Sequence, residues 1–184
     1  MQNTLDACVD KMNKSINALK DELNGIRTGR ASASIFDKVR VNYYDNPSPL
    51  SQVATISIPE ARMIVIQPWE KELITEIEKA ILKADLGLNP SNDGKIIRIS
   101  IPPLTAERRK ELVKQAKQIA ETSRVAIRNI RRDGNEDLKK QQKDGTISED
   151  ELKKSEDLLQ KSTDKFIGDI NKIMDDKEKE IMEG

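Results

Sequence analysis

The spacing of the apolar residues changes twice along this chain. Up to residue 26 and again beyond residue 104 they recur every three or four positions, which is the period of a helix packed lengthwise against partners. Between residues 30 and 103 several short segments instead alternate apolar and polar residues, as half-buried strands do. Because helices at both ends of the chain need partners for their apolar sides, we expect a helical bundle interrupted by an inserted domain.

The first helix is predicted from an a/d heptad pattern held for three repeats. Asn3 is a candidate N-cap for it, and Gly29 in the segment RTGR is expected to end it. Its apolar positions are Leu5, Val9, Met12, Ile16, Leu19, Leu23 and Ile26.

The middle segment has the pattern of a small domain of strands with one helix. The segments VRVNY, ATISI and IRISI predict half-buried strands, and the apolar run MIVI predicts a strand covered on both faces. Turns are expected at DNPSP and NPSNDG. A helix is predicted between MIVI and IRISI, ending before Gly87, with an apolar face made of Trp69, Leu73, Ile77, Ile81 and Ala84.

Two further helices follow residue 104. The second helix is expected to begin after a Thr105 cap and to stop at Gly145. Its apolar stripe is predicted to be Leu112, Ala116, Ile119, Ser123, Ala126, Ile130 and Leu138 with Asp137. The third begins with an S-x-x-E capping box at Ser148 and Glu151, between staple residues Ile147 and Leu152. Its predicted buried side is Leu152, Leu159, Phe166, Ile170, Ile173 and Ile181.

These elements predict an α+β protein of two domains. Residues 1–29 and 104–184 are expected to form a long three-helix bundle, and residues 30–103 an inserted β/α/β domain. Two chain crossings join the domains, and we expect them to act as a hinge. The predicted hinge residues are Thr28, Gly29, Arg30, Pro102, Pro103 and Leu104.

The composition removes the commonest catalytic and metal-binding arrangements. The chain has no histidine and one cysteine, so Ser-His and Cys-His nucleophiles and imidazole zinc sites are excluded. Cys8 is expected to be a small buried apolar residue. We predict no catalytic residues, no metal and no cofactor, and the lack of a signal segment favours the cytoplasm.

Charge is unevenly distributed although its formal sum is zero. From Arg108 to Arg132 there are nine basic residues against two acidic ones, whereas Asp144 to Gly184 holds seven lysines against thirteen acidic residues. We call one row of the second helix the basic stripe, expected roughly opposite the apolar stripe and interrupted only by Glu121. It comprises Lys110, Lys114, Lys117, Arg124, Arg128 and Arg131, with Arg132 at its edge.

The basic stripe has two interpretations from the pattern alone. Arginine at its clustered end suits phosphate, and the poverty of aromatic residues favours structured RNA over single strands as the ligand. Alternatively, the stripe is a solvated face, partly paired with the acidic third helix. A helical scaffold protein explains the heptads equally well, and an enzyme using Glu70 and Glu72 is disfavoured because side chains two apart on a helix diverge.

Segments across nearly the whole chain resemble the bacterial ribosome recycling factor family, in the order in which that family has them. They are IRTGRAS (26–32), YYDNPSPL (43–50), DLGLNPSNDG (85–94), IPPLTAERRKEL (101–112), AIRNIRRDGN (126–135) and ISEDEL (147–152). Departures from the family pattern are Ser32-Ala33 for a common Ser-Pro or Asn-Pro, Asp45-Asn46 for a glycine turn, and Gly134 for alanine.

The resemblance implies an L-shaped, tRNA-like molecule that catalyses no reaction itself. Independently of it, we expect a monomer, because the heptads are used inside the bundle, with an end-on dimer as the alternative. Family members bind the ribosome after termination and lay the bundle on large-subunit rRNA. Elongation factor G, using GTP, is thought to drive the hinged domain so that the subunits part. Carried onto this sequence, the strongest rRNA-binding candidates are Arg128, Arg131 and Arg27, and the weaker ones are Arg30, Arg109, Lys117, Arg124 and Arg132.

Overall fold

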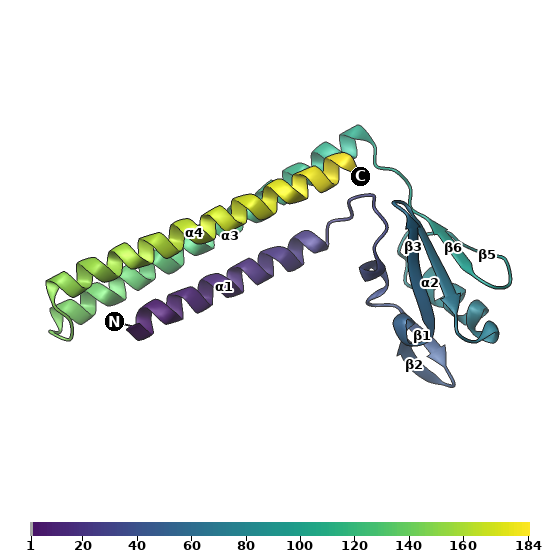
Figure 1. The fold of residues 1–184 in the computed structure, drawn as a ribbon, viewed down its shortest axis with the longest axis horizontal. Coiled ribbons are helices and arrows are strands. Elements are labelled where there is room, and N and C mark those ends of the chain that lie inside the picture. The colour runs from purple at the N-terminus through teal and green to yellow at the C-terminus, as the bar shows by residue number, and fades with distance from the viewer. Residues whose placement is uncertain (1) are drawn as a thin grey trace. The chain divides into compact units, whose positions relative to one another are not determined.

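The computed structural model describes residues 2–184 and divides them into two compact units (Figure 1). One unit is helical and combines the chain up to Arg27 with Ala106–Glu183. The other, Thr28–Thr105, holds the strands and one short helix. This mixture of long helices and a small sheet confirms the α+β fold class. Among the described residues, no helix is both long and apolar enough to cross a membrane.

Three helices form the first unit: α1 (Gln2–Asn24), α3 (Ala106–Lys143) and α4 (Glu149–Glu183). Helices α3 and α4 lie antiparallel along their length, and α1 packs against both (Figure 1). Each helix therefore buries its apolar side against the other two. The core of the helical unit includes Leu5, Cys8, Met12, Ile16, Leu19 and Leu23 of α1, Leu112, Ala116, Ala120, Ile127 and Leu138 of α3, and Leu159, Phe166, Ile170, Met174 and Ile181 of α4.

The turn between α3 and α4 has the predicted chemistry. Gly145 adopts a left-handed φ of 75° after α3, a conformation that glycine takes without steric cost. The capping box is confirmed, because Glu151 N donates to Ser148 Oγ at 3.2 Å and Ser148 N donates to Glu151 Oε2 at 2.7 Å. The start of α4 thus satisfies its own backbone donors.

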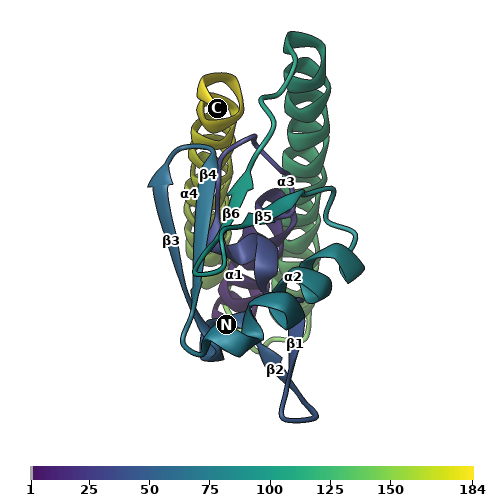
Figure 2. The same ribbon diagram turned by 90° about the vertical axis from the view of Figure 1, so that its right-hand side faces the viewer.

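The second unit contains an antiparallel sheet in the order β3-β4-β6-β5. Its strands are β3 (Ala54–Glu60), β4 (Met63–Pro68), β5 (Pro90–Asn92) and β6 (Ile97–Ser100). A separate hairpin pairs β1 (Arg40–Tyr43) with β2 (Asn46–Pro49). Helix α2 (Ile74–Lys83) packs against β1 and β5 (Figure 2). Its Ile77 and Ile81 are buried in one core with strand residues.

Short 3₁₀ turns connect these elements. They are η1 (Ala33–Phe36), η2 (Leu50–Gln52) and η3 (Lys71–Leu73). Ser32 caps η1 by accepting a hydrogen bond from Ser34 N, so the segment after the first chain crossing is ordered by its own side chains.

Several predicted boundaries are wrong. Helix α1 ends at Asn24, well before Gly29, and Asn3 lies within the helix and does not cap it. The expected turns at DNPSP and NPSNDG contain the short strands β2 and β5. Their backbones pair with β1 and β6, a long-range interaction that outweighs the turn preference of proline, asparagine and serine.

The predicted helix around Trp69 begins later than expected. Trp69 follows β4 with its side chain 65% exposed, and α2 starts at Ile74 after the turn η3. Its Nε1 donates to Thr55 Oγ1 at 3.1 Å, so the indole lies beside β3 and is not part of the helix's apolar face. The run MIVI is not covered on both faces either, because only Ile64 and Ile66 are fully buried while Met63 and Val65 are half-buried.

The buried side of α3 differs from the predicted stripe. Ala120 and Ile127 are fully buried, whereas Ile119, Ser123 and Ala126 are only half-buried. Two partner helices explain this difference, because one side of α3 packs against α1 and the adjacent side packs against α4. In α4, Leu152 and Ile173 are likewise half-buried, while Ser155 and Thr163 are buried and donate to the carbonyls four residues earlier.

Candidate nucleic-acid interface on α3

The basic stripe lies beside α4, not opposite the buried side of α3 as expected. Three of its side chains reach across to α4: Lys117 Nζ to Glu178 Oε1 at 3.1 Å, Arg124 Nε to Asn171 Oδ1 at 2.9 Å, and Arg131 Nη1 to Gln160 Oε1 at 3.1 Å. The stripe flanks the buried side because α3 is buried against two helices, and that buried side is wider than the single predicted stripe. From Lys117 to Arg131 the stripe is therefore bordered by α4 side chains.

Glu121 holds two of the arginines together. Its Oε2 accepts from Arg124 Nη1 at 3.0 Å, and its Oε1 accepts from Arg128 Nη1 at 3.2 Å. Hydrogen bonds from Arg124 and then Arg128 keep the pKa of Glu121 below its usual value, so the carboxylate is charged at neutral pH. One anion thus occupies a position between two guanidinium groups.

The guanidinium groups differ in how far they reach solvent. The Arg124 side chain is 21% exposed, whereas that of Arg128 is 47% exposed. Arg132 points outward, with Asp133 as a distant ion-pair partner at 3.8 Å. Ion pairs between exposed side chains contribute little stability in water, so an incoming phosphate can replace them.

Other members of the stripe are more open. Within residues 2–184, Lys110 and Lys114 are exposed and take part in no ion pair. Arg109 lies outside the stripe and donates to the Met182 carbonyl near the end of α4. Arg108, which pairs with Glu111 at 2.8 Å, lies on the other side of the helix from Arg128.

The remaining predicted binding residues lie near the division between the units. Arg27 is exposed and belongs to the helical unit, the same unit as Arg128 and Arg131. Arg30 is exposed in the other unit. The structure therefore brings Arg124 and Arg128 together at one carboxylate and leaves the other candidates separate.

Sequence reasoning missed the α4 partners of the stripe. Asn171 and Gln160 carry no formal charge, so the charge pattern gave no reason to select them. The acidic surplus of the last helix indicates that an acidic residue such as Glu178 could pair with the stripe. It does not show which residues of the two antiparallel helices lie opposite each other, so it could not select Glu178.

The predicted hinge segments touch each other inside the smaller unit. Gly29 has a left-handed φ of 77°, and a Cβ built there would lie 3.0 Å from Leu104 Cγ. Thr28 is buried, whereas Pro102 and Pro103 are exposed. Glycine is thus required at position 29 for both its backbone conformation and its close approach.

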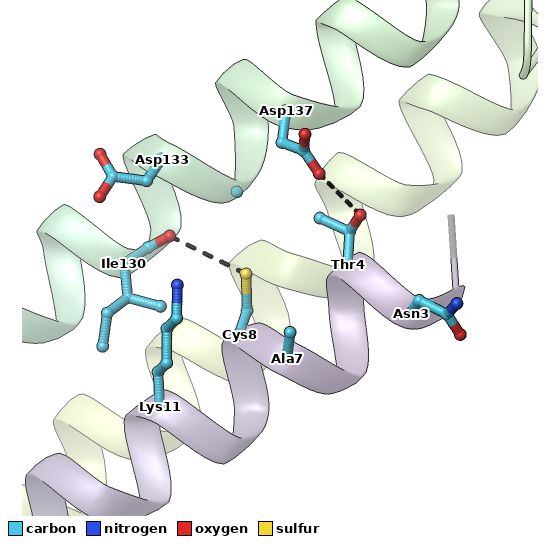
Figure 3. Close-up of a pocket in the computed structure, with 9 residues that line it drawn as sticks. Asn3, Thr4, Ala7, Cys8, Lys11, Ile130, Asp133 and Asp137 are labelled. Atoms are coloured by element: carbon cyan, nitrogen blue, oxygen red, sulfur yellow. Dashed lines mark hydrogen bonds between the residues drawn. The ribbon is translucent and has the colours of Figure 1, made fainter.

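A groove of about 290 Å³ between α1 and α3 has no catalytic arrangement (Figure 3). Burial raises the pKa of the Cys8 thiol above its usual value, and its sulfur lies 4.0 Å from the Ile130 carbonyl oxygen. Thr4 Oγ1 donates to Asp137 at 2.8 Å across the same groove. The prediction that Cys8 is buried is confirmed, and residues 2–184 hold no cluster of metal-ligating side chains.

Comparison with known proteins gives one consistent family. The model of the family described as "Ribosome recycling factor" matches residues 19–182. The ribosome-recycling factor of Treponema denticola is 64% identical over 96% of this chain and 95% of its own length. That of Brevibacillus brevis is 54% identical over 99% of this chain and 98% of its own length.

Solved structures agree with the sequence relatives. A solution structure of a ribosome recycling factor superposes with a TM-score of 0.79 at 43% identity, covering 100% of this chain and 97% of its own. A second has a TM-score of 0.65 at 46% identity and covers 98% of this chain and 97% of its own. It models the Thermus thermophilus factor and the E. coli elongation factor G bound to the E. coli post-termination complex.

Proposed function

The chain belongs to the ribosome recycling factor family, a family of non-enzymatic translation factors, and we propose that it disassembles post-termination ribosomal complexes together with elongation factor G and GTP. In this proposal the basic stripe of α3 binds phosphates of large-subunit rRNA. A factor with these partners works in the cytoplasm. Support for the partners comes from the relative that is placed on a post-termination complex with elongation factor G.

The pairing of Arg124 and Arg128 with Glu121 carries the proposal for the stripe. A carboxylate between two guanidinium groups occupies the position that a phosphate would take, because both are anions with several acceptor oxygens. From Lys110 to Arg131 the stripe runs about 32 Å at a rise of 1.5 Å per residue, which is long enough to follow several phosphates. The geometry favours contact with the backbone of folded RNA over reading of bases.

The two crossings between the units would act as the hinge of this factor. The first crossing contains the predicted hinge residues Thr28, Gly29 and Arg30. The second contains Pro102, Pro103 and Leu104. The contact between Gly29 and Leu104 supports coordinated movement of the two connecting segments. In this role the bundle anchors the factor, and the smaller unit moves under the action of elongation factor G.

The alternative function as a helical scaffold loses its main argument. The heptad residues of α1 are buried against α3 and α4 inside one chain, so they are not left over for partner helices. No observation on the described residues favours the scaffold over the recycling factor.

Subunit splitting tests the proposal. Light scattering would follow the dissociation of post-termination complexes by elongation factor G and GTP with the natural chain, with Arg128→Ala plus Arg131→Ala, and with Arg108→Ala. We expect each stripe arginine to contribute at least about tenfold to affinity, because a hydrogen bond to a charged group is worth about 1.5–3 kcal/mol and every 1.4 kcal/mol is about tenfold. The double variant should therefore split complexes only at much higher concentration.

Arg108→Ala is the matched control, since Arg108 is an exposed arginine on the same helix but outside the stripe. It should split complexes as the natural chain does. Equal activity of all three proteins would refute the assignment of the stripe. Failure of the natural chain itself to split complexes would refute the recycling function.

A further inference from the structure

One arginine of the basic stripe is linked to a carboxylate of α4 through a neutral amide. Arg131 Nη1 donates to Gln160 Oε1 at 3.1 Å, and Gln160 Nε2 donates to Asp164 Oδ1 at 2.8 Å. Gln160 and Asp164 are four residues apart on α4, so their side chains lie on the same side of that helix. We call these three side chains, which are hydrogen-bonded in series from α3 to α4, the Arg131 triad.

Asp164 determines which way the Gln160 amide points. A carboxylate only accepts hydrogen bonds and a guanidinium only donates them, whereas an amide does both through different atoms. Because its NH₂ group is bound to Asp164, Gln160 presents its oxygen to Arg131. The reverse orientation would set the amide oxygen against the carboxylate and the NH₂ group against the guanidinium, and both contacts would be lost.

Gln160 differs from the partner of the neighbouring arginines because it carries no charge. Arg124 and Arg128 both donate to the Glu121 carboxylate. Within residues 2–184, by contrast, Arg131 forms no ion pair. The contact with Gln160 uses one of the five N–H donors of the guanidinium. Arg131 is therefore held in place without its positive charge being neutralised by its partner.

Holding an arginine in this way favours the binding of an anion to it. A long side chain loses rotamer freedom when a ligand binds, and this loss weakens the affinity. Arg131 is half-buried beside α4, and its guanidinium is already bonded to Gln160 in the free protein. A ligand that binds the remaining donors therefore has less side-chain motion to suppress.

We propose that Gln160 and Asp164 are positioning residues, which hold the Arg131 guanidinium so that its remaining donors bind a phosphate of the rRNA backbone. This role rests on the function proposed for the basic stripe and adds two uncharged or acidic side chains of α4 to it. A neutral amide suits the role, because a carboxylate at position 160 would compete with the phosphate for Arg131, as Glu121 does for Arg124 and Arg128.

Binding to isolated large ribosomal subunits at one fixed salt concentration tests this role. The dissociation constant would be measured for the natural chain, Gln160→Ala and Asp164→Ala. Gln160→Ala should weaken binding about two- to tenfold, the range expected when one rotamer-rich side chain must be ordered by the ligand. Asp164→Ala should weaken it about two- to fivefold, because Gln160 keeps its oxygen but loses its fixed orientation.

The sign of the Asp164→Ala effect separates positioning from net charge. Removing a carboxylate beside the stripe would by itself strengthen the attraction to phosphates. Asp169→Ala is the matched control, because Asp169 is an exposed aspartate of α4 that lies on a different side of the helix from Asp164. It should not weaken binding. Tighter binding by both aspartate variants would overturn the proposal.

A double-mutant cycle tests whether Gln160 acts through Arg131. In the Arg131→Ala background, Gln160→Ala should have no further effect on the dissociation constant, because no guanidinium remains to be held. An equal loss in both backgrounds would contradict the positioning role. Nuclear magnetic resonance relaxation of the free chain adds a second readout: Gln160→Ala should lower the order parameter of Arg131 Nε at unchanged thermal stability.

Failure of this proposal can be distinguished from failure of the proposed function. If the natural chain binds large subunits and Arg131→Ala weakens that binding, but Gln160→Ala does not, the stripe is supported and the positioning role is refuted. If the natural chain does not bind, or if Arg131→Ala binds equally well, the assignment of the stripe is itself refuted, and the positioning role with it.

Discussion

At the scale of single residues, Glu121 is the side chain that most directly limits the proposed rRNA contact. It competes with phosphate for Arg124 and Arg128. Glu121→Gln should therefore tighten binding to large ribosomal subunits about two- to fivefold, the range expected for exposed ion pairs. Cosedimentation with isolated subunits measures this change.

Glu111→Gln is the control for that prediction, because Glu111 pairs with Arg108 away from the stripe. It removes the same charge from the same helix. Equal tightening by both variants would show that net charge, and not the position of Glu121, determines the affinity.

Gly134 is the second residue with a specific role. A Cβ at this position would lie 2.7 Å from Cys8 Sγ and 2.9 Å from Leu159 Cδ2, so glycine lets α3 approach both other helices. Gly134→Ala should lower the free energy of unfolding by about 1 kcal/mol, because overpacking outweighs the helix propensity gained. Urea unfolding measures the loss.

A double-mutant cycle with Cys8→Ala identifies the cause. Removing the sulfur frees part of the space, so the penalty of Gly134→Ala should be smaller in the Cys8→Ala background. Strictly additive effects would contradict the proposed clash.

Some of the candidate site could be predicted at residue scale and some could not. The uneven charge pattern identified the basic stripe, because the spacing of side chains on one helix is fixed by its geometry. The partners Gln160 and Asn171 could not be found this way, since their position depends on the register between two helices. The hydrogen bonds of Tyr43 and Tyr44 to Glu70 were also missed, because Glu70 is far from both tyrosines in sequence.

At the scale of elements, the start of α4 gives a pH-dependent prediction. The backbone hydrogen bond from Ser148 holds the pKa of Glu151 below its usual value. A depressed folded-state pKa contributes stability above the unfolded value, near 4.3, and this contribution is lost as pH falls through the folded value. The difference in stability between the natural chain and Glu151→Gln should therefore be largest near neutral pH and shrink below about pH 4.

Ser148→Ala removes the other half of the capping box. It should cost about 1 kcal/mol, the usual loss for an N-cap serine, and leave the pH dependence smaller. Circular dichroism during thermal unfolding at several pH values measures both effects. A Glu151→Gln penalty that does not change with pH would contradict the assigned charge effect.

Elements with strong local signals were predictable and those made by tertiary pairing were not. The capping box at Ser148 and Glu151 and the heptads of α1 are local, and the structure contains both. Strands β2 and β5 were missed because each exists only through its neighbour in space. The buried side of α3 was predicted as one apolar stripe, but contacts with both α1 and α4 determine which residues are buried.

At the scale of the whole molecule, the formal net charge of zero hides two opposed helices. The basic stripe of α3 borders the acidic α4, whose Glu178 pairs with Lys117 at 3.1 Å. If the stripe binds rRNA as proposed, acidic neighbours should weaken and localise that attraction without abolishing it. A factor that must leave the ribosome after each cycle benefits from such reversible binding.

The salt dependence of binding tests the central claim most directly, namely that the basic stripe contacts phosphates. The dissociation constant for large ribosomal subunits would be measured over a salt series for the natural chain and for Arg128→Ala plus Arg131→Ala. Each lost phosphate contact lowers the slope of log affinity against log salt by about 0.7–0.9, so the account predicts a reduction of about 1.5 for the double variant. Identical slopes and affinities for the two proteins would contradict it.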